Sequence, residues 1–378
     1  MGNLLMLISN NQELYGVKVK IENGCFVFRE NNCCLDEKTI RNVIGFINTL
    51  QRKYSNYKLP VRMEFINVEF ADKLTYIMLE CLCVYLIENC GYKVQVKISL
   101  EHRIHTEGFF SSPLLLLSKG EKINIEKFEE KFRLDIYKQH YRRVLSLREL
   151  EKKSYLCNLM DQIASFQKAF DVDEECREAI TEVIVELVGN ACEHGGANCL
   201  VDFDITKPTY RKKGTNNLFM GINIVVINFS ESLLGTGLRE KIQNDICCNS
   251  RDKMVQLALK NHSQFFDKDY CEEDFFNISA FQHKISRRSD RILGGTGLTK
   301  LIKSLETRSD AHMCYVMSGK RKLLFRQEYL TYNEDDWLGF NKQNDYLNSR
   351  PDESVFGRNQ YMFPGTAYNL NFVMEKEL

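Results

Sequence analysis

The sequence predicts a two-domain α/β protein, and three observations lead to this prediction. The chain has 378 residues, which is long for a single hydrophobic core. In roughly the first hundred residues, segments that alternate apolar and polar side chains are separated by segments with the apolar period of a helix. After residue 150, beyond a stretch of little periodicity, a second series of helices and strands begins.

Local patterns define the elements of the first series. Asn23 and Gly24 interrupt an alternating segment and predict a β-hairpin with a two-residue turn. Gly91 follows the second apolar helix at the position where glycine commonly ends a helix. The predicted elements are, in order, a hairpin over 16–29, a helix over 36–54, a strand over 61–65, a helix over 74–89 and a strand over 92–98.

Composition argues against several classes of function. Apolar residues make up 44% and charged residues 27%, which is typical of a soluble globular protein. Lys plus Arg and Asp plus Glu both number 51, so no net charge favours nucleic acid or an anionic membrane. The most apolar segment, 74–87, contains Glu80 and is too short to span a bilayer. The 14 cysteines show no metal-ligand spacing and no signal peptide precedes them, so we expect reduced thiols in a cytoplasmic protein.

The region between the two series is predicted as a connection. Residues 101–122 contain Gly108, Pro113 and Gly120 and have little periodicity, so we assign the linker there. Residues 125–150 are charged and broadly helical. They could form a connector or a dimerisation helix, and the sequence leaves both open.

The second series centres on a predicted helix over 179–194. One face carries apolar residues at helical spacing: Ile180, Val183, Ile184, Leu187, Val188 and Ala191. On another face a polar residue recurs every fourth position: Glu182, Glu186, Asn190 and His194. Gly189 inside the helix costs about 1 kcal/mol relative to alanine, and close approach of a backbone or ligand would explain it. Taken alone, this helix could equally be an ordinary amphipathic helix with a solvated polar face.

The other elements of the second series flank this helix in the sequence. They are a helix over 155–170, strands over 200–205 and 218–227, a long insertion over 229–293 with helical segments at 233–242 and 251–260, a glycine-rich segment over 294–298 that opens a helix, a strand pair over 311–317 and 322–325, and a last strand over 367–373.

The glycine-rich segment has the features of a phosphate-binding loop. It consists of Gly294, Gly295, Thr296, Gly297 and Leu298. Glycines let backbone amides approach an anion, and the N-terminus of the following helix adds its dipole. No Gly-Lys-Ser/Thr follows, so it is not a Walker A loop, and Lys300 occupies the third-glycine position of a Rossmann motif. Such a segment can also cap a helix for structural reasons alone.

The segment 61–72, followed by a helix, Gly91 and a strand, resembles the STAS-like domains of bacterial regulators. Those domains carry a strand and a phenylalanine-x-aspartate turn before a helix, and Phe70 and Asp72 match that turn here. The resemblance implies a partner-binding or regulatory domain over 1–100. A generic α/β module is the alternative.

The order of motifs in the second series is more specific. Glu186, Asn190 and His194 lie on one helix, Asn228 follows a strand, a long lid and the glycine-rich segment come next, and Gly365 and Thr366 precede the last strand. This order resembles the GHKL family of gyrase, heat-shock chaperones, histidine kinases and MutL, whose ATP-binding fold is also called the Bergerat fold. The resemblance implies an α/β sandwich over 151–378 with a lid at about 229–293, preceded by a linker and connector helix over 101–150.

The resemblance also implies roles and cofactors, namely ATP and Mg²⁺. Glu186 would be the general base that activates water, and Asn190 would ligate Mg²⁺ through its side-chain oxygen. The Thr366 hydroxyl would help to read adenine, and His194 would either reach phosphate or simply end its helix. The amides of Gly294, Gly295, Thr296, Gly297 and Leu298 would bind the phosphates, and the lid carries Lys284, Arg287, Arg288 and Arg291 just before them.

At Asn228 the chain departs from the family. The family has aspartate-x-glycine-x-glycine where this sequence has Asn228, Ser230 and Ser232 at the matching positions. The aspartate accepts a hydrogen bond from the adenine 6-amino group, and an asparagine oxygen can accept it too, although more weakly than a charged group. Ser230 in place of glycine is expected to narrow the pocket. Affinity, base preference and turnover all depend on this difference.

Three functions remain open from the sequence. The first is an ATPase whose Mg-dependent cycle drives a conformational switch passed to a protein partner, and Glu186 favours it. The second is a protein kinase of the anti-sigma or histidine-kinase type, although His140 lacks the acidic neighbour of a phosphoacceptor histidine. The third is a catalytically degenerate nucleotide-binding scaffold, suggested by Asn228. We expect a protein partner, with a homodimer as one option, and neither nucleic acid nor a membrane is indicated.

Overall fold

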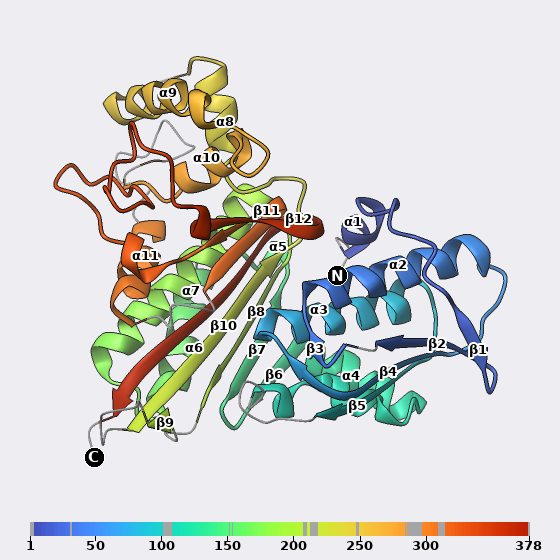
Figure 1. The fold of residues 1–378 in the computed structure, drawn as a ribbon. Coiled ribbons are helices and arrows are strands. Elements are labelled where there is room, and N and C mark those ends of the chain that lie inside the picture. The colour runs from blue at the N-terminus through green and yellow to red at the C-terminus, as the bar shows by residue number, and fades with distance from the viewer. Residues whose placement is uncertain are drawn as a thin grey trace.

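The computed structural model describes two α/β units that each contain one β-sheet. It describes residues 4–30, 32–100, 108–150, 152, 154–206, 210–211, 218–246, 249–283, 285, 297–308 and 314–376. Within these residues the strands form one sheet of five strands and one of seven (Figure 1). We call residues 4–133 the N-terminal unit and residues 134–376 the C-terminal unit. The predicted mixed α/β class is confirmed.

The sheet of the N-terminal unit is mainly parallel. Its strands are β1 (Lys20–Glu22), β2 (Cys25–Glu30), β3 (Cys34–Leu35), β4 (Val61–Phe70) and β5 (Val94–Leu100). Strands β2, β3 and β5 run parallel to β4, whereas β1 and β2 form an antiparallel hairpin. Asn23 and Gly24 have φ angles of 50° and 69°, the left-handed conformations that a two-residue hairpin turn requires. The predicted hairpin is therefore confirmed.

Side-chain caps define the helices of this unit. They are α1 (Leu4–Ser9), α2 (Glu37–Lys53), α3 (Lys73–Val84), which continues into a π-helical turn (Tyr85–Asn89), and α4 (Lys122–Arg133). Asp36 and Asp72 accept hydrogen bonds from the first backbone N–H groups of α2 and α3, which satisfies donors that a helix leaves open. Gly91, with a φ of 71°, follows the end of the second helix as predicted.

Helix α3 is buried along its whole length. A segment that is apolar around its full circumference needs cover on every side. On one side α3 contacts β4, and on another it contacts β10 and β12 of the second sheet (Figure 1). Leu200, Val225 and Ile227 of the second sheet accordingly belong to the same hydrophobic cluster as the core of the N-terminal unit. The two units therefore share a core.

The segment predicted as a linker is in part packed structure. Two 3₁₀-helices, Gly108–Ser111 and Pro113–Ser118, bury Phe109, Leu114 and Leu117 against the core of the N-terminal unit. The linker prediction missed these contacts because the segment is too short and irregular to show an apolar period.

The helical prediction for 125–150 is wrong beyond Arg133. After α4 the chain forms β6 (Leu134–Tyr137) and β7 (His140–Leu145), a hairpin at the edge of the second sheet, followed by the short α5 (Leu147–Leu150). Strand β7 buries His140 and Arg142 between the two units. Charged residues therefore occupy buried positions of β7 where apolar residues are expected. Because of this, the sequence of β7 does not show the apolar–polar alternation by which a strand is predicted.

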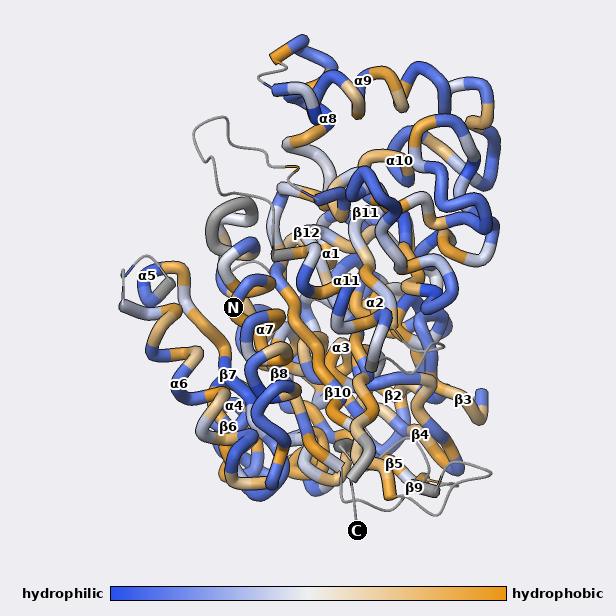
Figure 2. The backbone as a smooth tube through the Cα atoms, turned by 90° about the vertical axis from the view of Figure 1, so that its left-hand side faces the viewer, coloured by the Kyte–Doolittle hydropathy of each residue, from blue (hydrophilic) through white to orange (hydrophobic). Residues whose placement is uncertain are grey.

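The sheet of the C-terminal unit is antiparallel throughout its described pairings, in the order β11-β12-β10-β8-β7-β6, with β9 on β10. Its other strands are β8 (Cys199–Ile205), β9 (Tyr210–Arg211), β10 (Leu218–Asn228), β11 (Tyr315–Leu324) and β12 (Phe356–Lys376). Figure 2 shows the hydrophobic course of β10, which is covered on both faces. The predicted strands over 200–205 and 218–227 are confirmed.

One face of this sheet is covered by three helices, α6 (Tyr155–Lys168), α7 (Glu174–Gly195) and α11 (Gly297–Arg308), within the part that the structure describes (Figure 1). Each was predicted from its apolar stripe. The stripe of α7 packs onto the sheet as predicted: Ile180, Ile184 and Leu187 are buried in the core beneath it. None of the helices in the described ranges is long and apolar enough to cross a membrane.

The predicted strand pair over 311–325 is a single strand. Ser318 and Gly319 do not form a hairpin turn; they lie inside β11, which pairs with β12. The register shifts there, because Ser318 is opposite Thr366 while Gly319 is opposite Phe363. Gly319 has a φ of 59°, so the glycine that suggested a turn belongs to a β-bulge.

The insertion is more regular than the sequence suggested. It contains α8 (Thr236–Gln243), α9 (Ser250–His262), a 3₁₀-turn (Ser263–Phe265) and α10 (Glu272–Ser279), which lie together beyond one end of the sheet (Figure 1). Helices α8 and α9 correspond to predicted segments, whereas α10 was not predicted. Further 3₁₀-turns occur at Gln327–Tyr329 and Glu353–Val355.

Candidate functional site

Three elements of the C-terminal unit meet at one end of its sheet. Strand β10 ends at Asn228, which is paired with Thr366 of β12, and α7 ends at Gly195 close by. A methyl group added at Gly195 would lie 2.2 Å from Asn228 Nδ2, so a side chain there would displace this carboxamide. The structure thus brings two predicted site residues side by side, next to the end of the helix that carries Glu186.

Hydrogen bonds fix the orientation of the Asn228 carboxamide. The Thr366 N–H donates to Asn228 Oδ1 at 3.1 Å, and Asn228 Nδ2 donates to Ser230 Oγ at 3.5 Å. A backbone N–H can only donate, so the atom facing it must be the oxygen. The side chain is 6% exposed. Asn228 therefore joins β10 to β12, and these bonds use one of the two lone pairs of its oxygen.

The irregular position of β12 before Thr366 requires glycine. Gly365 has a φ of 87°, and a methyl group added there would lie 2.2 Å from the carbonyl oxygen of Asn228. Ser318 Oγ donates to the Gly365 carbonyl oxygen at 2.7 Å. The Gly365–Thr366 pair singled out in the sequence is thus a tightly packed part of the backbone beside Asn228.

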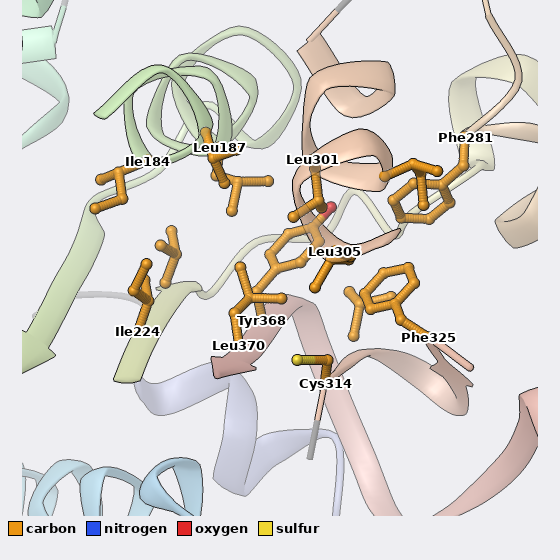
Figure 3. Close-up of a cluster of buried hydrophobic side chains, with 14 of the residues drawn as sticks. Ile184, Leu187, Ile224, Phe281, Leu301, Leu305, Cys314, Phe325, Tyr368 and Leu370 are labelled. Carbon is orange, nitrogen blue, oxygen red and sulfur yellow. The ribbon is translucent and has the colours of Figure 1, made fainter. Parts of the chain in front are cut away.

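The polar face of α7 lies toward α11. Glu182 forms an ion pair with Lys300 of α11 at 2.8 Å, and the two helices are in contact. One turn further along α7, Glu186 is half-buried and close to Tyr368 of β12. Burial raises the pKa of the Tyr368 hydroxyl, and the negative charge of Glu186 raises it further. Figure 3 shows Tyr368 extending from β12 toward Leu301 on α11.

The glycine-rich segment is only partly described. Gly297 is the first residue of α11 and Leu298 is half-buried against the core, so the predicted helix after the glycines is confirmed. The other predicted members of this region lie outside the described residues: Gly294, Gly295, Thr296, Lys284, Arg287, Arg288 and Arg291. The side chain of His194 also lies outside them.

Asn190 is the described candidate for a Mg²⁺ ligand, and Glu186, the predicted general base, is its neighbour on the polar face of α7. They are one turn apart on α7, both are partly exposed, and both offer oxygen atoms. Among the described residues, no group of three or more His, Cys, Asp or Glu side chains could hold a metal ion. Mg²⁺ usually takes one or two protein oxygens and completes its shell with water and phosphate oxygens, so Asn190 would suffice as the protein ligand of a nucleotide-bound ion.

A second polar constellation lies between the two units. We call it the charge cluster: Lys73 and Glu80 of α3, Asp135 of β6, His140 and Arg142 of β7, and Asp202 and Asp204 of β8. All of these side chains are buried. Charges removed from water need partners, and each member of the cluster has at least one of opposite sign.

Asp202 is the centre of the charge cluster. Its carboxylate lies 2.6 Å from Lys73 Nζ, 2.5 Å from Arg142 Nε and 2.8 Å from His140 Nε2. Burial alone would raise the pKa of Asp202, but these three cations hold it well below its usual value. Asp202 is therefore charged, and it connects β7, β8 and α3.

The other carboxylates of the charge cluster have different environments. Arg142 Nη2 lies 2.6 Å from Glu80 Oε2, and Ser112 Oγ donates to Glu80 Oε1 at 2.5 Å. Burial nevertheless raises the pKa of Glu80. His140 Nδ1 lies 3.3 Å from Asp135; burial would lower the pKa of His140, but the carboxylates on its two sides raise it.

Sequence reasoning missed the charge cluster and the neighbours of the predicted site. The available signal was that Asp202 and Asp204 alternate with apolar residues inside a strongly predicted strand, which places both carboxylates on one face. Buried acids of this kind require cations from another element. Nothing in the local sequence pointed to Gly195 or Tyr368, because their contacts arise from packing.

Comparisons with known proteins give no assignment. No protein-family model matches the sequence, and searches of curated proteins and of solved structures return no significant match. No disulfide bond joins cysteines within the part of the chain that the structure describes.

Proposed function

We propose that the C-terminal unit binds ATP with Mg²⁺ and hydrolyses it, and that the resulting change is passed to a protein partner. The observation that carries this proposal is the convergence of the end of α7 with the end of β10 and with Thr366 inside β12. Asn190 lies roughly 7 Å and Glu186 roughly 13 Å along the helix from Gly195, at a rise of 1.5 Å per residue. Polar groups thus extend from Asn228 and Thr366 along one face of α7, an arrangement that suits an elongated ligand with a base at one end and phosphates at the other.

Each residue has a role that its environment permits. The Glu186 carboxylate orients the attacking water and accepts its proton. Its side chain is only partly buried, so water can reach it. The Asn190 oxygen binds Mg²⁺, and the bound ion would neutralise charge on the phosphates. The N-terminus of α11 directs amides toward the phosphates. Asn228 and Thr366 lie at the end of the site that would hold the adenine ring.

This proposal includes the Bergerat fold for the C-terminal unit and a STAS-like regulatory role for the N-terminal unit. An antiparallel sheet with α6, α7 and α11 on one face supports the first. Parallel pairing of β2 and β5 with β4, and a capped helix after Phe70 and Asp72, support the second.

A specific experiment separates Glu186 from its neighbours. Phosphate release is measured for the unaltered protein, for Glu186→Gln and for Glu182→Gln. We expect Glu186→Gln to lower turnover by roughly 100-fold or more, the usual range for loss of a general base, while ATP affinity is retained. Glu182 is 45% exposed and paired with Lys300, so Glu182→Gln is the matched control and should hydrolyse at the parental rate. Unchanged turnover in Glu186→Gln would show that the assignment is wrong.

A nucleotide-binding scaffold without turnover is the second candidate, and Asn228 is the observation that favours it. Its carboxamide is buried and bonded to Thr366 and Ser230, so it contributes to the structure of the site. Binding of ATP with no phosphate release would support this alternative.

A kinase requires a phosphoacceptor, and His140 does not fit that role. It is 2% exposed and lies between Asp135 and Asp202. Transfer of labelled phosphate to the chain or to a co-purified protein would instead support the kinase.

A further inference from the structure

Strands β11 and β12 continue past the end of β10 as a two-stranded extension. Residues 319–323 of β11 pair with 356–363 of β12, whereas β10 ends opposite Thr366. We call these two segments the ribbon. A two-stranded ribbon is marginally stable by itself, so it depends on the elements that cover it. Those elements come from the N-terminal unit and from the helical insertion.

The N-terminal unit binds one side of the ribbon through Asn11. Its Nδ2 donates to the Met362 carbonyl oxygen at 2.7 Å, and its Oδ1 accepts from the Met362 N–H at 2.7 Å. Asn11 thus satisfies both backbone groups of Met362, as a neighbouring strand would. It is fully buried, and a second donor bond to Leu7 fixes its carboxamide.

Glu37, in the first turn of α2, makes the second contact on this side. Its carboxylate lies 2.6 Å from Lys322 Nζ and accepts a hydrogen bond from the Gln360 N–H. Both partners belong to the ribbon, one on each strand. Because Glu37 and Lys322 are mostly shielded from solvent, this pair is screened less than a surface pair.

The helical insertion binds the ribbon through Arg321, the residue before Lys322. Arg321 Nε donates to Asp274 Oδ1 at 2.6 Å, and both side chains are buried. Asp274 also accepts from the Cys271 N–H at the start of α10, so it caps the helix that it connects to the ribbon. Neighbouring residues in a strand point to opposite faces, which explains why Arg321 contacts α10 while Lys322 contacts α2.

The ribbon leads directly into the candidate site. Gly365 and Thr366 follow Phe363 after the register shift, and Ser318 bonds to Gly365 from the opposite strand. Ser318 Oγ also accepts from the Leu234 N–H at the start of the insertion, at 2.9 Å. Displacement of the ribbon would therefore move Gly365, the residue of the register shift that positions Thr366 beside Asn228.

We infer that the ribbon is the element through which the N-terminal unit and the helical insertion regulate the candidate nucleotide site, with Glu37 as a positioning residue. This inference rests on the proposed function. Nucleotide binding that favours the packing of α10 on the ribbon stabilises the ribbon through Arg321, and the stabilised ribbon strengthens the contacts to α2. Coupling between two sites is reciprocal. The change in nucleotide-binding free energy on replacing Glu37 should therefore equal the change that bound nucleotide causes in the free energy of the contact between Glu37 and the ribbon.

The test is amide hydrogen exchange on the full chain with Glu37→Gln, Lys322→Gln and the double variant. Gln at position 37 keeps the size and one acceptor, so the fold is retained. We expect exchange to accelerate roughly 5-fold or more, the lower end of allosteric couplings, both in residues 356–367 and in 272–279. The double variant should resemble either single variant, because one interaction is lost in all three.

Lys320→Gln is the matched control. Lys320 lies on the same strand and pairs with Glu13 at 3.6 Å, but the two side chains are 61% and 58% exposed. Its loss should leave exchange in both segments unchanged, because exposed pairs contribute little. Unchanged exchange of 272–279 in Glu37→Gln would overturn the inference, whether or not the ribbon itself loosens.

Nucleotide titration then distinguishes this inference from the proposed function. With a non-hydrolysable ATP analogue and Mg²⁺, the dissociation constant should rise roughly 5-fold or more for Glu37→Gln and remain unchanged for Lys320→Gln. If the unaltered protein binds no nucleotide, the proposed function fails while exchange still decides whether α2 and α10 are coupled. If nucleotide binds equally well to Glu37→Gln, regulation through the ribbon is refuted and the proposed function stands.

Discussion

Replacing Arg142 with methionine should destabilise both units together. Arg142 is fully buried in β7, and its guanidinium contacts Glu80 of α3 at 2.6 Å and Asp202 of β8 at 2.5 Å. Methionine fills much of the volume but supplies no charge. Asp202 keeps Lys73 as a partner, whereas Glu80 keeps only the Ser112 hydroxyl among the contacts described above.

The expected loss is about 3–5 kcal/mol in the free energy of unfolding, the usual cost of leaving one buried charge without its partner. Burial already raises the pKa of Glu80, and removing Arg142 raises it further. Glu80 can then bind a proton as the pH falls, which neutralises the orphaned carboxylate. The loss should therefore be smaller at acidic pH than at pH 8.

Urea denaturation is a suitable measurement, because the single tryptophan, Trp337, is buried in the C-terminal unit and reports its unfolding. The double variant Glu80→Gln/Arg142→Met removes the orphaned charge and should recover part of the loss, with a coupling energy of about 0.5–3 kcal/mol. Lys122→Met removes an exposed pair with Glu126 and should leave the midpoint unchanged. A loss below about 1 kcal/mol in Arg142→Met, or no recovery in the double variant, would refute the electrostatic role given to the cluster.

Two further predictions concern pH and backbone geometry. Because Asp202 and Asp135 raise the pKa of His140 above its usual value, its charged form contributes stability that is fully present below about pH 6.5 and is lost as the pH rises through the raised pKa. Urea midpoints measured from pH 6 to 9 should show this fall in the unaltered protein and not in His140→Gln; the same fall in both would contradict it. Gly365→Ala combines a left-handed backbone, which costs about 1–2 kcal/mol, with a clash at 2.2 Å against a backbone oxygen. It should lower thermal stability clearly more than Gly24→Ala, which is left-handed but has open space around it, and equal losses would count against the close packing described for Gly365.

Elements defined by nearby residues could be predicted from the sequence. Gly91 predicts the end of the second apolar helix, and Asn23–Gly24 predicts the first hairpin. Each signal works because the interaction involved spans only a few residues. The apolar stripe of α7 was equally readable, and it identified both the buried face and the face that carries Glu186.

Prediction failed where polar residues enter the core. Strand β7 was assigned to a helix because His140 and Arg142 look like surface residues until Asp202 and Glu80 are placed beside them. The bulge at Gly319 was interpreted as a turn because glycine serves both structures and only the pairing with β12 distinguishes them. In both cases the deciding partner is distant in the chain.

The candidate site shows the same division. The sequence selected Glu186, Asn190, Asn228 and Thr366, and the structure brings Asn228 and Thr366 together as a pair. Their roles in binding nucleotide remain predictions. The close approach of Gly195 could not be foreseen, since it depends on how α7 lies over the sheet.

By itself, the sequence determined the elements with a clear local signal, the buried face of α7 and the order of the candidate motifs, because these follow from interactions within a turn, a hairpin or a periodic stripe. The tertiary structure decided which elements meet. It placed α3 between two sheets, assembled the charge cluster from four elements, and joined Asn11 to Met362 across 351 residues of chain. Those contacts depend on desolvation and on complementary polar groups in distant segments. The residues next to each partner in the sequence do not reveal which distant segment it will contact.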